Sequence, residues 1–210
     1  MYIKNVYVPD IFDKYFVNKK ITKIIKGHHS GDLVYRISNE YILKISNNIE
    51  GIKKEKEVND FLSDKLPVSK SVEFIIEGEK AYYLKTLVKG KNLISNEYLD
   101  KPFLLIDLLV EALKIYHSVD ISGCNIFNNE SSGSTFIHGD FCLPNILVKN
   151  NKVSGFIDTQ TSGIGDAWVD YAWCIWSLEY NLKTNKYTPL LLEKLGIEFD
   201  EEKYKKYINN

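Results

Sequence analysis

Hydrophobic and polar residues form short strand-like runs along the first half of the chain. Four runs rich in β-branched and aromatic residues stand out, at residues 21–26, 33–38, 41–46 and 81–88. The segments between the first three contain Gly, Asn and Asp, which are typical of turns. Residues 50–62 are instead typical of a helix that ends at Ser63, ahead of Pro67. The pattern predicts a small antiparallel sheet with one helix.

The second half of the chain is predicted to be mainly helical. Residues 101–119 are apolar almost all round, so this segment is expected to be a buried central helix. Apolar runs at 146–148 and 153–157 flank the turn-forming residues 149–152, which predicts a β-hairpin. An aromatic-rich run from Trp168 to Trp176 has near-helical spacing and favours core packing over a stacking platform. The fold class is therefore α+β.

One cluster of polar residues carries most of the chemical information. The triplet His138-Gly139-Asp140 is followed by Asn145, and the hairpin would fold Asp158 back toward Asn145. A carboxylate that orients an incoming hydroxyl and accepts its proton suits Asp140. Mg²⁺ prefers oxygen ligands that it shares with substrate phosphates, which suits the Asn145 amide and the Asp158 carboxylate. The set predicts phosphoryl transfer from a nucleotide.

Plainer interpretations stand beside this one. Asp and Asn in loops are most often turn formers, and an isolated His-Gly-Asp triplet is common. We assign His138 to structure, because a His beside a catalytic loop more often fixes the backbone by hydrogen bonding. Cys142 lies in the same loop, but the sequence shows no partnered His or nearby charge that would lower its pKa. A nucleophilic role for Cys142 is therefore disfavoured.

These motifs resemble those of the aminoglycoside phosphotransferases, especially the 3′-phosphotransferase (kanamycin kinase) group. The likeness covers residues 134–207 and rests on the HGD triplet with an Asn five residues after the Asp. Residues 152–158 (KVSGFID) and 165–172 (GDAWVDYA) are similar to the family too. In kinase-like folds an Asp at the position of Asp170 more often braces the catalytic loop than binds metal.

The resemblance implies a protein-kinase-like fold of two lobes. Residues 1–88 would form the nucleotide-binding lobe, a small antiparallel sheet with one helix. Residues 89–210 would form a mainly helical lobe that carries the catalytic loop and the metal site. It also implies Mg²⁺ and ATP as cofactors, with GTP remaining open as the donor. The P-loop pattern GxxxxGK[ST] does not occur, which excludes a P-loop kinase.

A lysine of the third strand is the candidate for holding the nucleotide phosphates. The strand's alternation places Lys44 on one face with Ile42, and a Lys buried at a nucleotide site contacts the α and β phosphates. Glu55, on the predicted helix, is the carboxylate expected to hold Lys44. The alternative for Lys44 is a surface residue on an edge strand. The alternative for Glu55 is a solvated charge on the helix, since Glu57 is a near neighbour.

Five further residues are expected at the nucleotide. In a kinase-like lobe the loop after the first strand lies over the phosphates, which makes Ser30 and Gly31 candidates. The same loop also suits a plain hairpin turn. By the resemblance, Thr86 and Val88 would offer backbone groups to the adenine edge. Ile42 would pack on the base where relatives often carry an aromatic residue, with some loss of stacking.

The resemblance weakens in the regions that bind the acceptor. Relatives carry a long helical insertion before the catalytic loop, where this chain has the polar loop 122–137. The acidic pair that relatives place after the Trp-containing helix aligns with Tyr180 and Asn181, and the chain stops short of their acidic, aromatic tail. Charge-assisted contacts are each worth about 1.5–3 kcal/mol, so weaker binding of a polycationic sugar is expected.

Three functions remain open at this stage. The first is an antibiotic kinase with a reduced site for its aminoglycoside acceptor. The second is a kinase of another small hydroxyl compound, such as an amino alcohol or a sugar. The third is a nucleotide-binding remnant of the family with little catalysis.

Composition narrows the remaining classes. The net charge of −1 argues against a nucleic-acid partner. The chain has no run of about 18 apolar residues and no signal-peptide core at its N-terminus, so we expect no membrane partner and a cytoplasmic location. Its three cysteines include no CxxC pair, which suggests neither a disulfide framework nor a zinc site. We expect a monomer or, through an exposed apolar patch, a homodimer.

Overall fold

The computed structural model describes residues 2–3, 6–24 and 31–208 of the chain. The chain divides into two compact units, residues 1–63 with 69–87 and residues 64–68 with 88–210. The predicted boundary after residue 88 differs from this division at segment 64–68 and at Val88, both of which group with the second unit.

Close contacts explain why these residues group with the second unit. The backbone N–H of Phe156 donates to the carbonyl of Pro67 at 3.0 Å. A Cβ atom on Gly155 would lie 2.2 Å from Cγ1 of Val88 and 2.5 Å from the Pro67 carbonyl oxygen. Only a glycine lets these segments approach so closely, so the lack of a side chain at this position fixes the packing.

The first unit contains an antiparallel five-stranded sheet in the order β3-β4-β5-β7-β6. Its strands are β3 (Ile21–Ile24), β4 (Leu33–Ile37), β5 (Tyr41–Ser46), β6 (Ser71–Glu77) and β7 (Lys80–Thr86). The four predicted strands are present, and residues 25–26 of the first lie outside the described residues. The edge strand β6 went unpredicted, because its residues are half-buried or exposed without the alternation that marks a strand in sequence.

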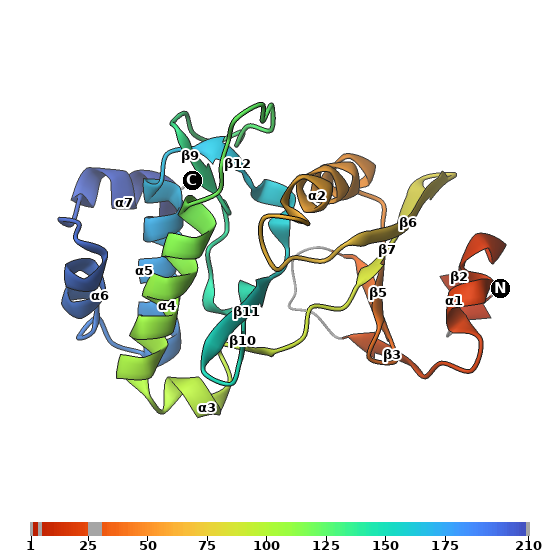
Figure 1. Cartoon of the computed structure of the whole chain (residues 1–210), viewed down its shortest axis with the longest axis horizontal. Coiled ribbons are helices and arrows are strands. Elements are labelled where there is room, and N and C mark those ends of the chain that lie inside the picture. The colour runs from red at the N-terminus through yellow and green to blue at the C-terminus, as the bar shows by residue number, and fades with distance from the viewer. Residues whose placement is uncertain (1, 4–5, 25–30, 209–210) are drawn as a thin grey trace. The chain divides into compact units, whose positions relative to one another are not determined.

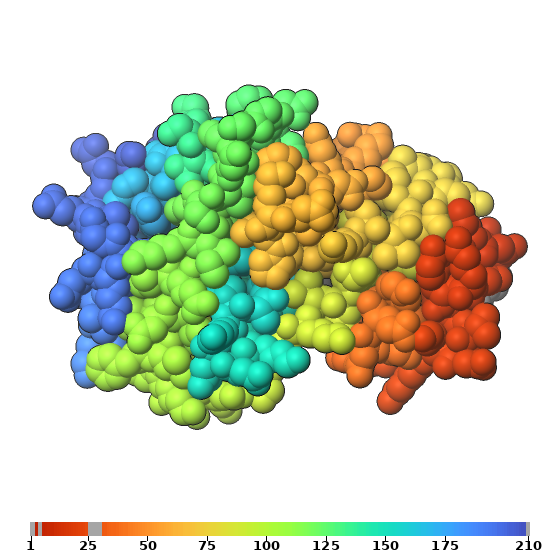
Figure 2. All heavy atoms as spheres, in the orientation of Figure 1, coloured from red at the N-terminus to blue at the C-terminus, as the bar shows by residue number. Residues whose placement is uncertain are grey.

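Helices cover the sheet on both faces (Figure 1). Helix α2 (Ile49–Leu62) packs on one face, and its first turn is capped by Asn48, which accepts the Gly51 N–H at 3.0 Å. The N-terminal elements β1 (Tyr2–Ile3), β2 (Val6–Tyr7), η1 (Asp10–Phe12) and α1 (Asp13–Phe16) pack on the other face. In the space-filling view they are the red atoms against the orange and yellow strands (Figure 2). The alternation predicted for β5 is confirmed, because Leu43 and Ile45 pack in the apolar core between the sheet and these N-terminal elements.

The second unit is mainly helical, as predicted. Its helices are α3 (Asn96–Leu99), α4 (Pro102–His117), α5 (Trp168–Leu182), α6 (Thr188–Leu195) and α7 (Glu201–Ile208). Helix α4 packs against α5 and α6, and α7 packs against α5 (Figure 1). The apolar side chains of α4 are mostly buried, but Phe103 is 66% exposed, so the prediction of burial on every face was wrong at the first turn.

Two small antiparallel sheets hold the loops of the second unit. Strands β8 (Lys91–Asn92), β10 (Ile146–Lys149) and β11 (Lys152–Phe156) form one, and β9 (Thr135–Ile137) pairs with β12 (Gly163–Gly165) in the other. The β10–β11 hairpin confirms the prediction, and its turn residues Asn150 and Asn151 have φ angles of 55° and 56°. Positive φ at both central residues is the geometry that favours a two-residue hairpin turn.

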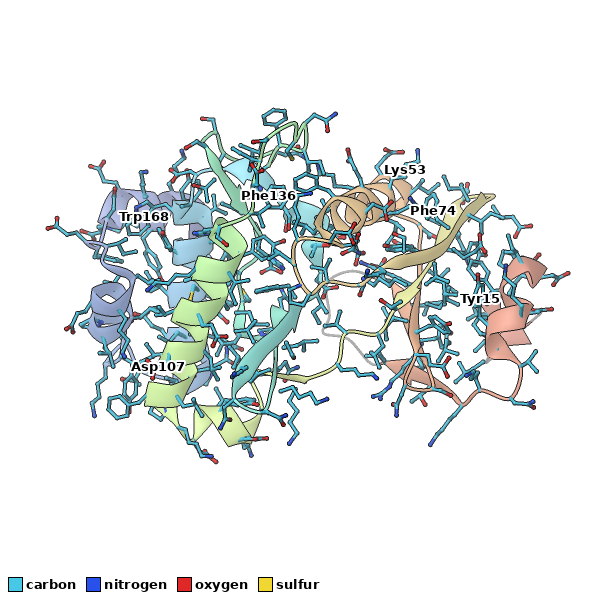
Figure 3. The ribbon with its side chains drawn as sticks, viewed as in Figure 1. Tyr15, Lys53, Phe74, Asp107, Phe136 and Trp168 are labelled. Carbon is cyan, nitrogen blue, oxygen red and sulfur yellow. The ribbon has the colours of Figure 1, made fainter. Side chains whose placement is uncertain are left out.

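The aromatic residues of α5 are only partly in the core. Trp168, at the start of the helix (Figure 3), and Trp173 pack against buried residues that include Val169 and Tyr207. Trp176 instead stacks on Tyr180, which is 58% exposed, with 5.1 Å between the ring centroids. Trp176 is half-buried, as are Trp168 and Trp173, so these three side chains line the edge of the core rather than its centre. Within the described part of the chain, no helix is both long and apolar enough to cross a membrane.

Candidate active site

The candidate catalytic loop runs from the end of β9 to the start of β10 and turns at Gly139. This glycine has a φ of 81°, and a Cβ atom on it would lie 2.5 Å from the carbonyl oxygen of Thr161. Both the backbone conformation and the close approach require glycine. The hydroxyls of Thr161 and Ser162 donate to the His138 carbonyl at 3.0 Å each, which ties the loop to the 3-10 turn η3 (Thr159–Thr161).

Asp170 braces the loop from the first turn of α5. Its carboxylate is fully buried, and it accepts the backbone N–H groups of His138 and Gly139 at 2.8 Å each. Nε2 of His117 lies 2.9 Å from the same carboxylate. Buried carboxylates need such partners because an unpaired charge is costly away from water. The expectation that Asp170 braces the loop rather than joining the chemistry agrees with this geometry.

His138 links the loop to the segment that carries Asp158. Its Nδ1 accepts the backbone N–H of Asp140 at 3.3 Å, so the ring proton must sit on Nε2, which donates to the Ile157 carbonyl at 3.0 Å. Both ring nitrogens are therefore engaged in holding backbone. The structural role assigned to His138 fits these contacts.

Asp140, Asn145 and Asp158 come together at the end of the hairpin. The amide Nδ2 of Asn145 donates to the Asp140 carboxylate at 2.9 Å and to the Asp140 carbonyl at 3.0 Å. The backbone N–H of Ile157 donates to the Asn145 carbonyl at 3.0 Å, which brings the neighbouring Asp158 alongside. Asp158 has left-handed backbone angles, φ 59° and ψ 49°. Such angles are uncommon outside glycine and are enriched at functional sites.

This arrangement fits the ligand set of a magnesium ion. Because Nδ2 of Asn145 faces Asp140, its Oδ1 is the atom of the amide that can bind a cation. Asp158 adds a carboxylate, and Mg²⁺ usually takes one or two protein oxygens and completes its shell with phosphates and water. Among residues 2–3, 6–24 and 31–208, no group of three or more His, Cys, Asp or Glu could hold a metal by itself. Asn145 and Asp158 would thus serve a metal that arrives with phosphates.

Cys142 lies in the same loop but is poorly suited to be a nucleophile. Its side chain is buried, and that burial, followed by the negative charge of Asp140, raises the pKa of the thiol far above its usual range. A thiol with a raised pKa stays protonated at neutral pH and reacts slowly. The geometry supports the expectation that Cys142 has no chemical role.

The first unit contains a separate cluster of four charged side chains. Nζ of Lys44 lies 2.9 Å from Oε2 of Glu55, which is the pair expected from sequence, and both side chains are buried. The other oxygen of Glu55 binds Nζ of Lys85, and Asp32 lies 3.4 Å from Lys44. Lys44 and Lys85 therefore share the buried carboxylate of Glu55.

Sequence reasoning missed Lys85 and Asp32. The signal for Lys85 was present in the alternation of β7, because Lys85 lies opposite Ile42 in the sheet and so shares a face with Lys44. The register between β5 and β7 was needed to use that signal. Asp32 is the last residue of the expected loop, where an acidic residue is normally taken as a turn former.

The structure describes four of the five remaining predicted nucleotide residues. Gly31 is exposed and has a φ of 60°, and Ile42 is half-buried on β5 beside Lys44. The N–H of Thr86 donates to the Lys70 carbonyl at 2.9 Å, so the carbonyl is the backbone group that Thr86 can offer to a base. Val88 is half-buried and groups with the second unit. Ser30 lies outside the described residues.

A mixed helix-and-sheet fold with these two clusters defines a kinase-like phosphotransferase. Comparison with known proteins agrees. A family model described as the phosphotransferase enzyme family matches residues 126–206. An aminoglycoside 3′-phosphotransferase of Enterococcus faecalis is 30% identical, with 75% of this chain and 76% of the relative covered. A probable aminoglycoside 3′-phosphotransferase of Lactococcus lactis is 25% identical, with 74% and 75% covered.

Solved structures show the same fold. A type VIII aminoglycoside-3′-phosphotransferase has a TM-score of 0.73 at 18% identity, covering 90% of this chain and 91% of that one. An aminoglycoside phosphotransferase of Streptomyces rimosus, in complex with ADP and streptomycin, has a TM-score of 0.71 at 16% identity, covering 86% and 91%. The chain belongs to the aminoglycoside phosphotransferase family, as its motifs suggested, and it is a kinase.

Proposed function

We propose that this kinase transfers the γ-phosphate of ATP to a hydroxyl group of an aminoglycoside. One observation carries the proposal: Asn145 holds the Asp140 carboxylate at 2.9 Å, beside a left-handed Asp158 at the end of a hairpin. The names of the 30% and 25% identical relatives point to the acceptor class.

Asp140 is proposed to be the base. Its Oδ2 accepts the Asn145 amide, and the other carboxylate oxygen is proposed to accept the acceptor hydroxyl. As the acceptor oxygen forms its bond to the γ-phosphorus, the bond from that phosphorus to the bridging oxygen breaks, and the hydroxyl proton passes to Asp140. Asp170 keeps Asp140 in position through the backbone of the two preceding residues. The products are the phosphorylated acceptor and ADP.

Asn145 and Asp158 are proposed to hold Mg²⁺, which when bound neutralises charge on the phosphates. In the first unit, Lys44 would bind the α and β phosphates and Glu55 would hold Lys44 in place. Ser30 and Gly31 would contribute loop groups near the phosphates. Thr86 and Val88 would offer backbone groups to the base, and Ile42 would pack on its face. Because one solved relative is in complex with ADP and another with GDP and kanamycin, GTP remains a second candidate donor.

A different acceptor is favoured by one observation on α5. Tyr180 and Asn181 stand where the resemblance implies an acidic pair, and Nζ of Lys183 lies 3.9 Å above the Tyr180 ring. An ammonium group at this end of the helix repels a polycation, whereas a neutral sugar or another small alcohol would be tolerated. The second proposed acceptor class is therefore a small hydroxyl compound of low positive charge.

A nucleotide-consumption screen with kanamycin, amino alcohols and sugars tests these proposals, with ATP and GTP run in parallel. Stimulation by kanamycin supports the aminoglycoside, and stimulation by a small alcohol alone supports the second class. Nucleotide binding without stimulated turnover would instead indicate a catalytically weak remnant. Asp140→Ala should abolish transfer while leaving Mg²⁺–nucleotide binding nearly unchanged, whereas Asp158→Ala should weaken both. Wild-type turnover by Asp140→Ala would exclude Asp140 as the base.

A further inference from the structure

Asp32 forms an ion pair with Lys44, the lysine that is proposed to bind the nucleotide phosphates. Its Oδ2 lies 3.4 Å from Nζ of Lys44, and the two side chains are only 8% and 5% exposed. The position is unusual for a carboxylate in a nucleotide site, because a phosphate and a carboxylate repel each other when both are negative.

The charges of the cluster explain why Asp32 contacts Lys44 in the protein without nucleotide. Lys44 and Lys85 carry two positive charges, and Glu55 and Asp32 carry two negative charges, so the charges of these four side chains balance. Neutrality matters because these groups are almost shielded from water, where an uncompensated charge is costly. An arriving phosphate adds negative charge at Lys44, after which one carboxylate is in excess.

Of the two carboxylates, Asp32 is the one that can leave. Glu55 is fully buried and binds a lysine with each of its oxygens. Asp32 makes the longer contact to Lys44, 3.4 Å against 2.9 Å for Glu55. It also follows Gly31, which is exposed, and among the described residues no atom lies within 4 Å of a Cβ built on this glycine. Asp32 is therefore the more weakly held of the two carboxylates.

We propose that Asp32 is an internal competitor of the nucleotide phosphates for Lys44, and so a residue that sets nucleotide affinity. The proposal rests on the proposed role of Lys44. In the nucleotide-free protein Asp32 takes the position of a phosphate oxygen and balances the buried charge. Nucleotide binding then includes the cost of displacing it, and the same contact favours release of the product nucleotide.

The test is Asp32→Asn, which keeps the size of the side chain and removes its charge. We expect the Kd for ADP and for a non-hydrolysable ATP analogue to fall by about three- to tenfold. Asp32→Glu, which keeps the negative charge, should bind nucleotide no more tightly than the wild type. Asp60→Asn, which removes an exposed partner of Lys56 on α2, is the matched control and should leave the Kd unchanged.

Thermal denaturation provides a second readout. Asp32→Asn should melt at a lower temperature than the wild type without nucleotide, because Lys44 loses a buried partner. The rise in Tm on adding saturating nucleotide should be larger than for the wild type, since ligand stabilisation follows affinity. A purely structural role would lower both melting temperatures without enlarging the rise. If Asp32→Asn does not fold, Asp32→Ala is measured in the same way.

Two outcomes would overturn the inference. Weaker binding by Asp32→Asn would mean that Asp32 supports the nucleotide site, and unchanged binding would mean that it does not compete. Lys44→Ala separates this failure from failure of the proposed function. If Lys44→Ala binds nucleotide as the wild type does, the role of Lys44 itself is wrong. If only the Asp32 result disagrees, the proposed function stands and the competition is excluded.

Discussion

The carboxylate of Asp170 accepts the backbone N–H of Gly139 at 2.8 Å, across 31 residues of sequence. The same carboxylate accepts the neighbouring N–H of His138, so one buried side chain fixes two consecutive peptide groups. The residue that follows them is Asp140, the proposed base. The position of the base is thus set by a helix that begins well after it in the chain.

Replacing Asp170 should therefore damage both stability and catalysis. Asp170→Asn turns one acceptor into an NH₂ group that faces a backbone N–H, which should cost about 1–3 kcal/mol in the free energy of unfolding. A shift of the loop by about 1 Å should lower kcat roughly 100-fold. Urea denaturation and steady-state kinetics measure the two effects. Asp107→Asn is the control, because Asp107 lies exposed on α4 with Lys194 as its partner (Figure 3). Equal behaviour of the two variants would contradict the bracing role.

The stability of the first unit should depend more on Glu55 than on any other carboxylate of α2. Glu55→Gln leaves two buried lysines with one partner fewer, and breaking a buried ion pair in this way costs about 3–5 kcal/mol. Glu57→Gln, two residues away in the same helix, removes only an exposed contact to Lys54 at 3.9 Å and should change stability by less than about 0.5 kcal/mol.

The partner Lys85 provides a further check on this network. Adding Lys85→Met to Glu55→Gln removes the second buried charge, so the double variant should be more stable than Glu55→Gln alone. Chemical denaturation of the wild type, Glu55→Gln, Lys85→Met and the double variant completes a double-mutant cycle. Strict additivity would show that Glu55 and Lys85 are not coupled.

Gly139 should tolerate no side chain. Gly139→Ala combines an unfavourable φ of 81° with a Cβ 2.5 Å from a backbone oxygen, so the loop has to move and activity should be lost. Gly196→Ala is the matched control, because its φ is 69° but no atom of the residues that the structure describes lies within 4 Å of the added Cβ. That variant should lose only the cost of the backbone conformation, about 1–2 kcal/mol, with normal turnover. Active Gly139→Ala enzyme would refute the close packing of the loop.

Asp166 should make the attachment of α7 sensitive to acid. Its carboxylate accepts Nζ of Lys203 at 2.9 Å and the hydroxyl of Tyr207 at 3.1 Å. Burial alone would raise the pKa of Asp166, but the Trp168 N–H and the Lys203 ammonium outweigh it and hold the pKa below its ordinary value of 3.8. A depressed folded-state pKa stabilises the fold above the unfolded-state pKa, and that stability disappears as the pH falls through the folded value.

The measurement is urea denaturation of the wild type and Asp166→Asn between about pH 3 and pH 7. The wild type should be the more stable protein at neutral pH, and the difference should shrink below about pH 4. The exposed Asp107→Asn variant is the control for the loss of one carboxylate. A difference that stays constant across the range would argue against the charge of Asp166 as its cause.

The sequence by itself determined the central helix and the hairpin of the second unit, and the kinase class of the protein. Local patterns were sufficient there: the turn at Asn150 and Asn151, the apolar α4 segment and the spacing from Asp140 to Asn145 all lie within short stretches of chain. Positive φ at the two Asn residues shows why the turn was readable, because its geometry depends on those residues alone. The edge strand β6 was missed because pairing with β7, rather than its own pattern, makes it a strand.

The tertiary structure decided which further polar groups meet, beyond the one pair that the sequence predicted. Lys44 and Glu55 were paired correctly from sequence, yet the sharing of Glu55 with Lys85 follows from the register of two strands that are not consecutive in the chain. The approach of Asp32 to Lys44 depends on how the chain turns into β4. Ion pairs and hydrogen bonds act over a few ångströms between atoms distant in sequence, so periodicity cannot reveal them. The sequence therefore predicted a kinase, whereas the fold determined which carboxylates contact Lys44 and the catalytic loop.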